Sequence, residues 1–270
     1  ISENLIQIKN SIPQEVTLVA VSKTKPVSDI LQAYQAGQRH FGENKIQEMT
    51  EKYEQMPQDI FWHMIGHVQT NKVKYMAPYV HLIHGVDSFK LLVEINKQAQ
   101  KNNRVINCLL QVFIAQEETK FGLDANELNE ILNSEALKSL KNINIAGLMG
   151  MASFTENVTQ VQEEFSTLNQ LYLKHKNSTT FNINFKHLSM GMSGDYEDAV
   201  AQGLEHGAAD DTVGGHGEVE RDGAQSGNAN LHQGLGSLLG LAEQAQQQFG
   251  DGLEQEQTGT HDDNGVENGQ

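Results

Sequence analysis

Short apolar runs alternate with helix-periodic stretches through the first 203 residues of the chain. Each run is rich in branched or aromatic residues and is short enough to be a buried strand. The seven runs lie at 17–22, 40–43, 61–66, 81–86, 107–114, 145–151 and 187–192. A closed (β/α) barrel needs eight strands, so this count is one short.

Helix signals fill the intervals between these runs. Pro26 and Ser28 begin one predicted helix, and Gly37 ends it. Ser88 begins another, and the apolar spacing over 154–168 predicts a long amphipathic helix. This alternation predicts parallel strands with helices outside them, as a doubly wound sheet or as a barrel.

The first run ends abruptly in two lysines and a proline, at 18–26 (Leu-Val-Ala-Val-Ser-Lys-Thr-Lys-Pro). Such a run is typical of a strand that is buried on both faces and delivers an amine to the rim of a parallel sheet. The neutral amine of Lys23 would attack an aldehyde to form an imine. If the extended run persists, Lys25 shares its face and favours the neutral form of Lys23. The alternative is a pair of solvated lysines at a strand end.

The seventh run ends in small residues and hydroxyls, at 188–194 (Leu-Ser-Met-Gly-Met-Ser-Gly). With a short helix opening at Ser193, the backbone N–H groups and the hydroxyls of Ser189 and Ser193 would cradle a phosphate. The alternative is an ordinary strand-to-helix turn with Ser193 as N-cap. An imine-forming lysine and a phosphate site on one rim together describe a pyridoxal phosphate pocket. His63, in the third run, would lie beside the cofactor ring or be a hydrogen-bonded histidine of the core or the rim.

The charge balance narrows the choice of partners. The chain has 19 basic and 35 acidic residues, so we expect neither nucleic acid nor an anionic membrane as a partner. No apolar run approaches the roughly 20 residues that span a bilayer, and no leader precedes the first run, which indicates a cytoplasmic setting. The single cysteine, Cys108, cannot form an internal disulfide, and we expect it to be a small core residue.

The composition changes near residue 204. Residues 204–270 hold 13 of the acidic residues, one basic residue and 14 of the 24 glycines. We therefore expect a barrel domain over 1–203 and a disordered acidic tail rich in Gly and Gln over 204–270, with one possible short helix at 235–249. A metal site in this tail is the alternative, but nothing there fixes ligand geometry, so we expect no metal. Its candidate ligands are His206, Asp210, Asp211, His216 and Glu218.

Taken together, the motifs resemble those of a known family, the pyridoxal phosphate homeostasis proteins. The matching segments are 20–26, 41–44, 62–66 with Gln69, Asn71 and Lys72, Lys120 with Gly122, 147–149 and 188–193. They occur in the family's order over roughly residues 3–203. The combination is far more specific than any one of the motifs.

The resemblance implies an eight-stranded TIM-type barrel like the N-terminal domain of alanine racemase, with pyridoxal 5'-phosphate bound as an imine on Lys23. The other cofactor-binding residues it implies are Asn44, His63, Met149, Ser189, Gly191, Met192 and Ser193. The implied function is storage of the cofactor and its delivery to apo pyridoxal phosphate enzymes, by a monomer without established turnover. Racemisation needs an acid or base on each face of the substrate, and the second domain of alanine racemase that supplies one is not found here.

One departure from the family stands out. The family continues with an eighth strand containing Arg-Ile-Gly-Ser/Thr, whereas 204–213 reads Leu-Glu-His-Gly-Ala-Ala-Asp-Asp-Thr-Val. We therefore expect the eighth strand to be missing or replaced, leaving the first and seventh strands with unpaired edges. Such an abrupt junction suggests a chimeric or frameshifted reading frame. The alternatives for function are a weak amino-acid racemase that uses Lys23 as base, and an incomplete barrel that binds no cofactor.

Overall fold

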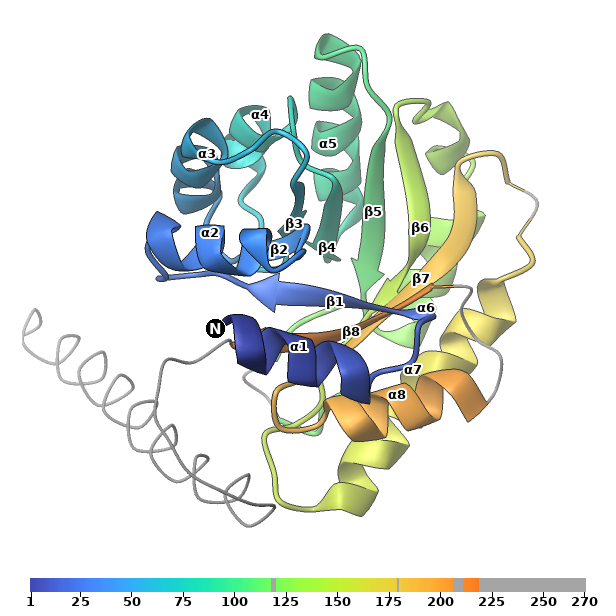
Figure 1. Cartoon of the computed structure of the whole chain (residues 1–270). Helices are drawn as coiled ribbons and strands as arrows, with labels where there is room; N and C mark the ends of the chain where they lie inside the picture. The colour runs from blue at the N-terminus through green and yellow to red at the C-terminus, as the bar shows by residue number, and fades with distance from the viewer. Residues whose placement is uncertain (118–119, 179, 206–210, 219–270) are drawn as a thin grey trace, which may run out of the picture. The chain divides into compact units, whose positions relative to one another are not determined.

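The structure, a computed structural model, describes residues 1–117, 120–178, 180–205 and 211–218, the side chains of 204–205 and 211–218 excepted. Its strands form one closed parallel barrel in chain order, in which each strand pairs with the next and the last pairs with the first (Figure 1). The strands are β1 (Val16–Val21), β2 (His40–Glu43), β3 (Phe61–Met64), β4 (Leu82–Val86), β5 (Ile106–Gln111), β6 (Ile143–Met149), β7 (Ile183–Met192) and β8 (Asp211–Glu218). The predicted barrel of the alanine racemase type is therefore confirmed.

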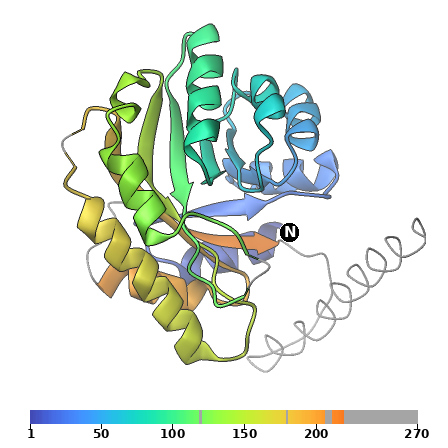
Figure 2. The same cartoon turned by 180° about the vertical axis from the view of Figure 1, so that it is seen from behind.

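Helices cover the outside of the barrel, as the view from behind also shows (Figure 2). Several begin at residues whose side chains accept backbone N–H groups: Ser88 before α5, Asn157 before α7, and Asp124, which forms a capping box with Glu127, before α6. The α-helices are α1 (Ser2–Ser11), α2 (Val27–Gln35), α3 (Ile46–Gln55), α4 (Val73–Met76), α5 (Phe89–Lys101), α6 (Ala125–Asn133), α7 (Val158–His175) and α8 (Tyr196–Glu205). Among the described residues there are also two short 3₁₀ helices, η1 (Thr70–Lys72) and η2 (Leu137–Ser139). None of the described helices combines the length and the hydrophobicity that crossing a membrane requires.

The hydrophobic core has two layers. The larger lies between strands and helices, where β1 contributes Leu18 and Ala20. A smaller cluster, made of Leu82, Leu109, Ala146 and Met149, comes from β4, β5 and β6. Alternate residues of a barrel strand face inward and outward, which accounts for the two layers.

The eighth strand is present, which corrects the expectation of unpaired edges. β8 pairs in parallel with β1 through Val16 and Thr212, and with β7 through Leu188 and Thr212. Backbone pairing places no demand on particular side chains, so a glycine-rich segment of the right length closes the barrel. Of the two alternatives, missing or replaced, the structure supports a strand of replaced sequence.

The predicted tail does not begin at residue 204 as a separate segment. Ile1–Arg221 form one compact unit, and the predicted tail supplies the end of α8 and all of β8. The boundary after residue 203 therefore falls before the last strand of the barrel. The expected disorder and short helix of the remaining tail, and the metal ligands considered there, lie outside the described residues and side chains.

Candidate functional site

Lys23 stands in a tight turn at the carboxyl end of β1. The Ser22 N–H donates to the Gly42 carbonyl at 2.9 Å, so the extended backbone continues to Ser22. The Lys25 N–H then donates back to the Ser22 carbonyl at 3.1 Å, and Thr24 has a φ of 62°. The prediction that an extended run puts Lys25 on the face of Lys23 is therefore wrong, because the chain reverses between them. Lys23 is half-buried at the rim.

A buried polar cluster, here called the clamp network, holds this turn from the helix side of the sheet. Nζ of Lys52, on α3, donates to the Ser22 carbonyl at 2.5 Å and to one carboxylate oxygen each of Glu43 and Glu48 at 2.7 Å. The Ser22 hydroxyl donates to the same Glu43 oxygen at 2.6 Å. The Thr24 N–H donates to Glu48 at 2.6 Å. The clamp network (Ser22, Glu43, Glu48 and Lys52) therefore fixes the backbone on both sides of Lys23.

The two carboxylates of the clamp network differ electrostatically. Burial raises the pKa of the fully buried Glu43, although hydrogen bonds from Lys52 and Ser22 oppose that rise. Burial also acts to raise the pKa of Glu48, but hydrogen bonds from Lys52 and the Thr24 N–H outweigh it, so this pKa is lowered. Glu48 is therefore the carboxylate that stays ionised most readily beneath the turn.

Two strands away from β1, the carboxyl end of β7 is tightly built. Gly191 has a φ of 84°, and a Cβ there would lie 2.7 Å from the Ala199 side chain, so only glycine fits. Ser189 is fully buried, with Oγ 2.8 Å from Nδ1 of His84. Met149 is cross-strand neighbour to Ser189.

The helix after β7 begins later than the sequence predicted. α8 begins at Tyr196, so the expectation of a helix opening at Ser193 is wrong by three residues. The carboxylate of Asp195 accepts the Met192 N–H, and the Asp195 carbonyl accepts the Ala199 N–H. Burial raises the pKa of Asp195, and the Met192 N–H opposes the rise. One backbone amide predicted to cradle an anion is thus bonded to a carboxylate of the chain itself.

The remaining candidate residues separate into two groups. Asn44 is exposed just after β2, and Ser193 is exposed after β7, both at the carboxyl ends of strands. His63, on β3, is 2% exposed, and its two ring nitrogens lie 3.0 Å from His40 Nδ1 and 2.8 Å from His84 Nε2. His63 is therefore part of a hydrogen-bonded chain of side chains, here called the histidine chain (His40, His63, His84 and Ser189). Its link to the carboxyl end of β7 is indirect, through His84 and Ser189.

A cavity of about 410 Å³ opens beyond the ends of β3 and β4. It is lined by His67, Val68, Gln69, Thr70, Asn71, Asp87, Ser88 and Leu91. The described part of the chain therefore has a cavity at this rim that none of the candidate cofactor residues lines.

A barrel with an amine after β1 and a positive-φ glycine at the end of β7 belongs to a recognisable class. The family model described as "Alanine racemase, N-terminal domain" matches residues 1–207. The alanine racemase of E. faecalis has the same fold, with a TM-score of 0.59 at 13% identity, over 81% of this chain and 56% of that one. The fold of this chain is therefore that of the barrel domain of alanine racemases.

More similar proteins narrow the class to one family. The chain is 40% identical to the pyridoxal phosphate homeostasis protein of Aquifex aeolicus over 187 residues, 69% of this chain and 80% of that protein. It is 34% identical to that of Escherichia coli K12 over 218 residues, 75% and 91% of the two chains. PipY of Synechococcus elongatus PCC7942, solved with PLP bound, gives a TM-score of 0.69 at 32% identity, covering 79% of this chain and 97% of PipY. The chain belongs to the pyridoxal phosphate homeostasis protein family.

Proposed function

We infer that this protein binds pyridoxal phosphate and acts in cofactor homeostasis. The family membership supports this role over that of a racemase, and a relative of similar fold binds PLP. The observation on the chain itself that carries the inference is the turn of Lys23. An amine at the rim of a barrel, held in a turn by a network of buried charges, is a site built to present a nucleophile.

The residues present fit the two ends of the cofactor. Pyridoxal phosphate supplies an aldehyde that condenses with amines, and we propose that Lys23 is the amine it meets. The turn around Gly191, with the hydroxyls of Ser189 and Ser193, fits the phosphate, because backbone amides at the start of α8 attract anions. Met192 contributes its N–H once the Asp195 carboxylate releases it. This exchange of one anion for another would make phosphate binding compete with Asp195.

The other candidate residues would shape the space between these ends. We propose that Asn44 and Met149 flank the cofactor, one polar at the exposed rim and one apolar at the end of β6. His63 would act indirectly, because His84 connects it to the Ser189 hydroxyl. The histidine chain would thus orient that hydroxyl rather than contact the ring.

Storage and delivery, rather than turnover, is the proposed role. Racemisation needs a proton donor or acceptor on each face of the substrate carbanion. Lys23 would supply one face, and we propose that no second group serves the other. Apo pyridoxal phosphate enzymes are the proposed recipients of the cofactor, and a monomer is the proposed form.

The attachment point can be mapped directly. The full chain is purified, saturated with pyridoxal phosphate, reduced with borohydride, digested and analysed by peptide mass mapping. We expect the ring on Lys23 and a visible absorbance band that Lys23→Ala abolishes. Lys25→Ala is the matched control, two residues away in the same turn, and should keep both label and band. A label on Lys25, or a chain that stays colourless with excess cofactor, would contradict the proposal and favour a barrel that binds no cofactor.

Delivery and turnover are separated by two further assays. Mixed with an apo enzyme that needs pyridoxal phosphate, the loaded protein should restore its activity and lose its own absorbance band. Enantiomer analysis after incubation with L-alanine should show no more D-alanine than the Lys23→Ala variant produces. D-alanine above that control would instead support the racemase alternative.

A further inference from the structure

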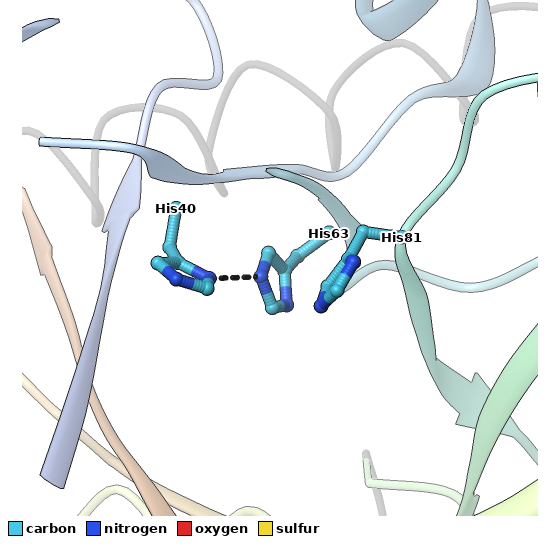
Figure 3. A group of neighbouring side chains, drawn as sticks. All are labelled: His40, His63 and His81. Carbon is cyan, nitrogen blue, oxygen red and sulfur yellow. Dashed lines mark hydrogen bonds between the residues drawn. The ribbon is translucent and has the colours of Figure 1, made fainter. Parts of the chain in front are cut away.

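Three histidines meet at the amino-terminal end of the barrel, away from Lys23. His40 is the first residue of β2, His63 lies on β3, and His81 directly precedes β4 (Figure 3). One ring nitrogen from each lies within 4.8 Å of the other two. The contact between His40 Nδ1 and His63 Nε2 is 3.0 Å. The imidazoles of three neighbouring strands thus lie close together in one cluster.

Strand register brings these rings together. His40 pairs with Phe61, two residues before His63 on β3. The His81 N–H donates to the Trp62 carbonyl at 2.9 Å, which places His81 beside the same segment. The Phe61 ring packs against both His40 and His81, with ring centroids 4.7 and 4.6 Å apart. The cluster is therefore fixed by backbone pairing and has an aromatic side wall.

The central imidazole is already oriented as a metal ligand would be. The Nδ1 atom of the buried His63 lies 2.8 Å from His84 Nε2, and His84 Nδ1 lies 2.8 Å from Ser189 Oγ. Metal-binding histidines nearly always use their second nitrogen in such a hydrogen bond, which fixes the tautomer and the ring plane. His63 Nε2 is then directed at His40, and the His81 ring lies beside the His63 ring, with ring centroids 5.4 Å apart.

The protonation state suits a cation. Burial lowers the pKa of His40 to about 4, with His81, Lys9 and His187 adding to the effect. Burial also lowers the pKa of His81, with smaller contributions from His187 and Arg104. A lowered pKa favours the neutral form of each imidazole, which is the form that binds a metal ion.

We propose that His40, His63 and His81 form a binding site for a divalent transition metal ion of the imidazole-binding kind, such as Zn²⁺. Bonds of 2.0–2.1 Å at tetrahedral angles set ligand nitrogens about 3.4 Å apart. The largest separation in the cluster thus has to close by at most about 1.4 Å. His40 and His81 are only partly buried, so rotation of their side chains provides this movement. Three protein nitrogens leave the fourth position for water or another ligand.

This site is separate from the proposed cofactor site. His40 begins the strand that Asn44 follows, so the two sites lie at opposite ends of β2. The two sites are connected only through His63, which reaches the Ser189 hydroxyl by way of His84, so metal binding and imine formation at Lys23 are tested by separate measurements. The simpler alternative is a set of hydrogen-bonded imidazoles with no affinity for metals, and the experiment has to distinguish the two.

Titration of the full chain with Co²⁺ and Zn²⁺, in cofactor-free protein, tests the site. One Co²⁺ per chain with visible d–d bands, displaced by Zn²⁺, is expected. His81→Gln, which removes a partly exposed ligand, should weaken Zn²⁺ binding at least tenfold in calorimetry. His67→Gln is the matched control, because His67 is a rim histidine paired with Asp87 outside the cluster, and it should bind as the parent does.

A second ligand variant keeps the test decisive. His40→Gln should weaken Zn²⁺ binding like His81→Gln, and circular dichroism should show the parent spectrum for both. No metal binding by the parent chain overturns the proposal. So does a site that survives both substitutions, since the ion would then be bound elsewhere, for example by histidines of residues 206–261.

Discussion

The clamp network and the histidine chain are both buried and polar, yet they differ in how their polar groups are stabilised in the interior. The clamp network lies between β1, β2 and α3 and carries full charges, with Lys52 bonded to two carboxylates and a carbonyl. The histidine chain connects β2, β3, β4 and β7 and consists of rings and a hydroxyl. A charged side chain is stable in the interior only when an opposite charge or a hydrogen bond lies close to it. A neutral imidazole needs no such partner, and its charge changes with pH in the range where histidine titrates. The first arrangement is suited to holding a shape and the second to responding to conditions.

Lys52→Met should have the largest effect, because it leaves the buried Glu43 and the Ser22 carbonyl without their cation. Removal of one partner of a buried ion pair costs about 3–5 kcal/mol. Denaturant unfolding measures the loss, and Lys101→Met, at the exposed end of α5, should change it by less than about 0.5 kcal/mol. The double variant Glu43→Leu, Lys52→Met should recover most of the stability. If the single variant is neutral, the clamp network does not stabilise the turn.

Glu48→Gln should have an intermediate effect and act on the turn itself. Charge-assisted hydrogen bonds contribute about 1.5–3 kcal/mol each, and Glu48 accepts two, from Lys52 and from the Thr24 N–H. Hydrogen exchange at Thr24 should accelerate more than exchange in α5. Glu51→Gln, on the exposed face of the same helix, is the control. Equal acceleration in both variants would show that Glu48 has no special contact with the turn.

The histidine chain should make stability depend on pH in a defined window. The pKa of His40 is lowered from 6.5 to about 4 in the folded protein. Between these two pH values, His40 is protonated in the unfolded chain but neutral in the folded one. The stability this provides is present above pH 6.5 and is lost as pH falls toward 4. Unfolding at a series of pH values in chelator should show this loss, and His40→Gln should have a shallower slope. Parallel curves for the two proteins would mean that His40 is protonated equally in both states.

The smallest effect concerns the strain at Thr24. A β-branched residue at a φ of 62° costs roughly 1–2 kcal/mol, so Thr24→Gly should stabilise the protein by up to about 1 kcal/mol. Asn103, at a φ of 52°, is the control, since asparagine tolerates this region and Asn103→Gly should change stability by only a few tenths of a kcal/mol. Destabilisation by Thr24→Gly would show that the bond of the Thr24 hydroxyl to the Lys23 carbonyl outweighs the strain.

The sequence predicted the barrel, and the place of Lys23 just after its first strand, because both follow from periodicity and motif. The turn at Thr24 was missed since threonine is a poor marker of a left-handed conformation. The clamp network was missed because Lys52 looks like an ordinary surface lysine until α3 is packed against the sheet. β8 was missed for a third reason. Glycine has low strand propensity, and the pairing comes from the open edges of β1 and β7 rather than from the segment's own side chains.

The closing strand has a consequence for how the chain reaches its native state. Residue 16 pairs with residue 212, so β1 stays without one neighbour until nearly the whole barrel sequence has left the ribosome. Contacts that join such distant positions form late and slowly, because the intervening chain must be ordered first. Newly made chains would expose two strand edges during that interval and depend on chaperones more than proteins with local contacts do.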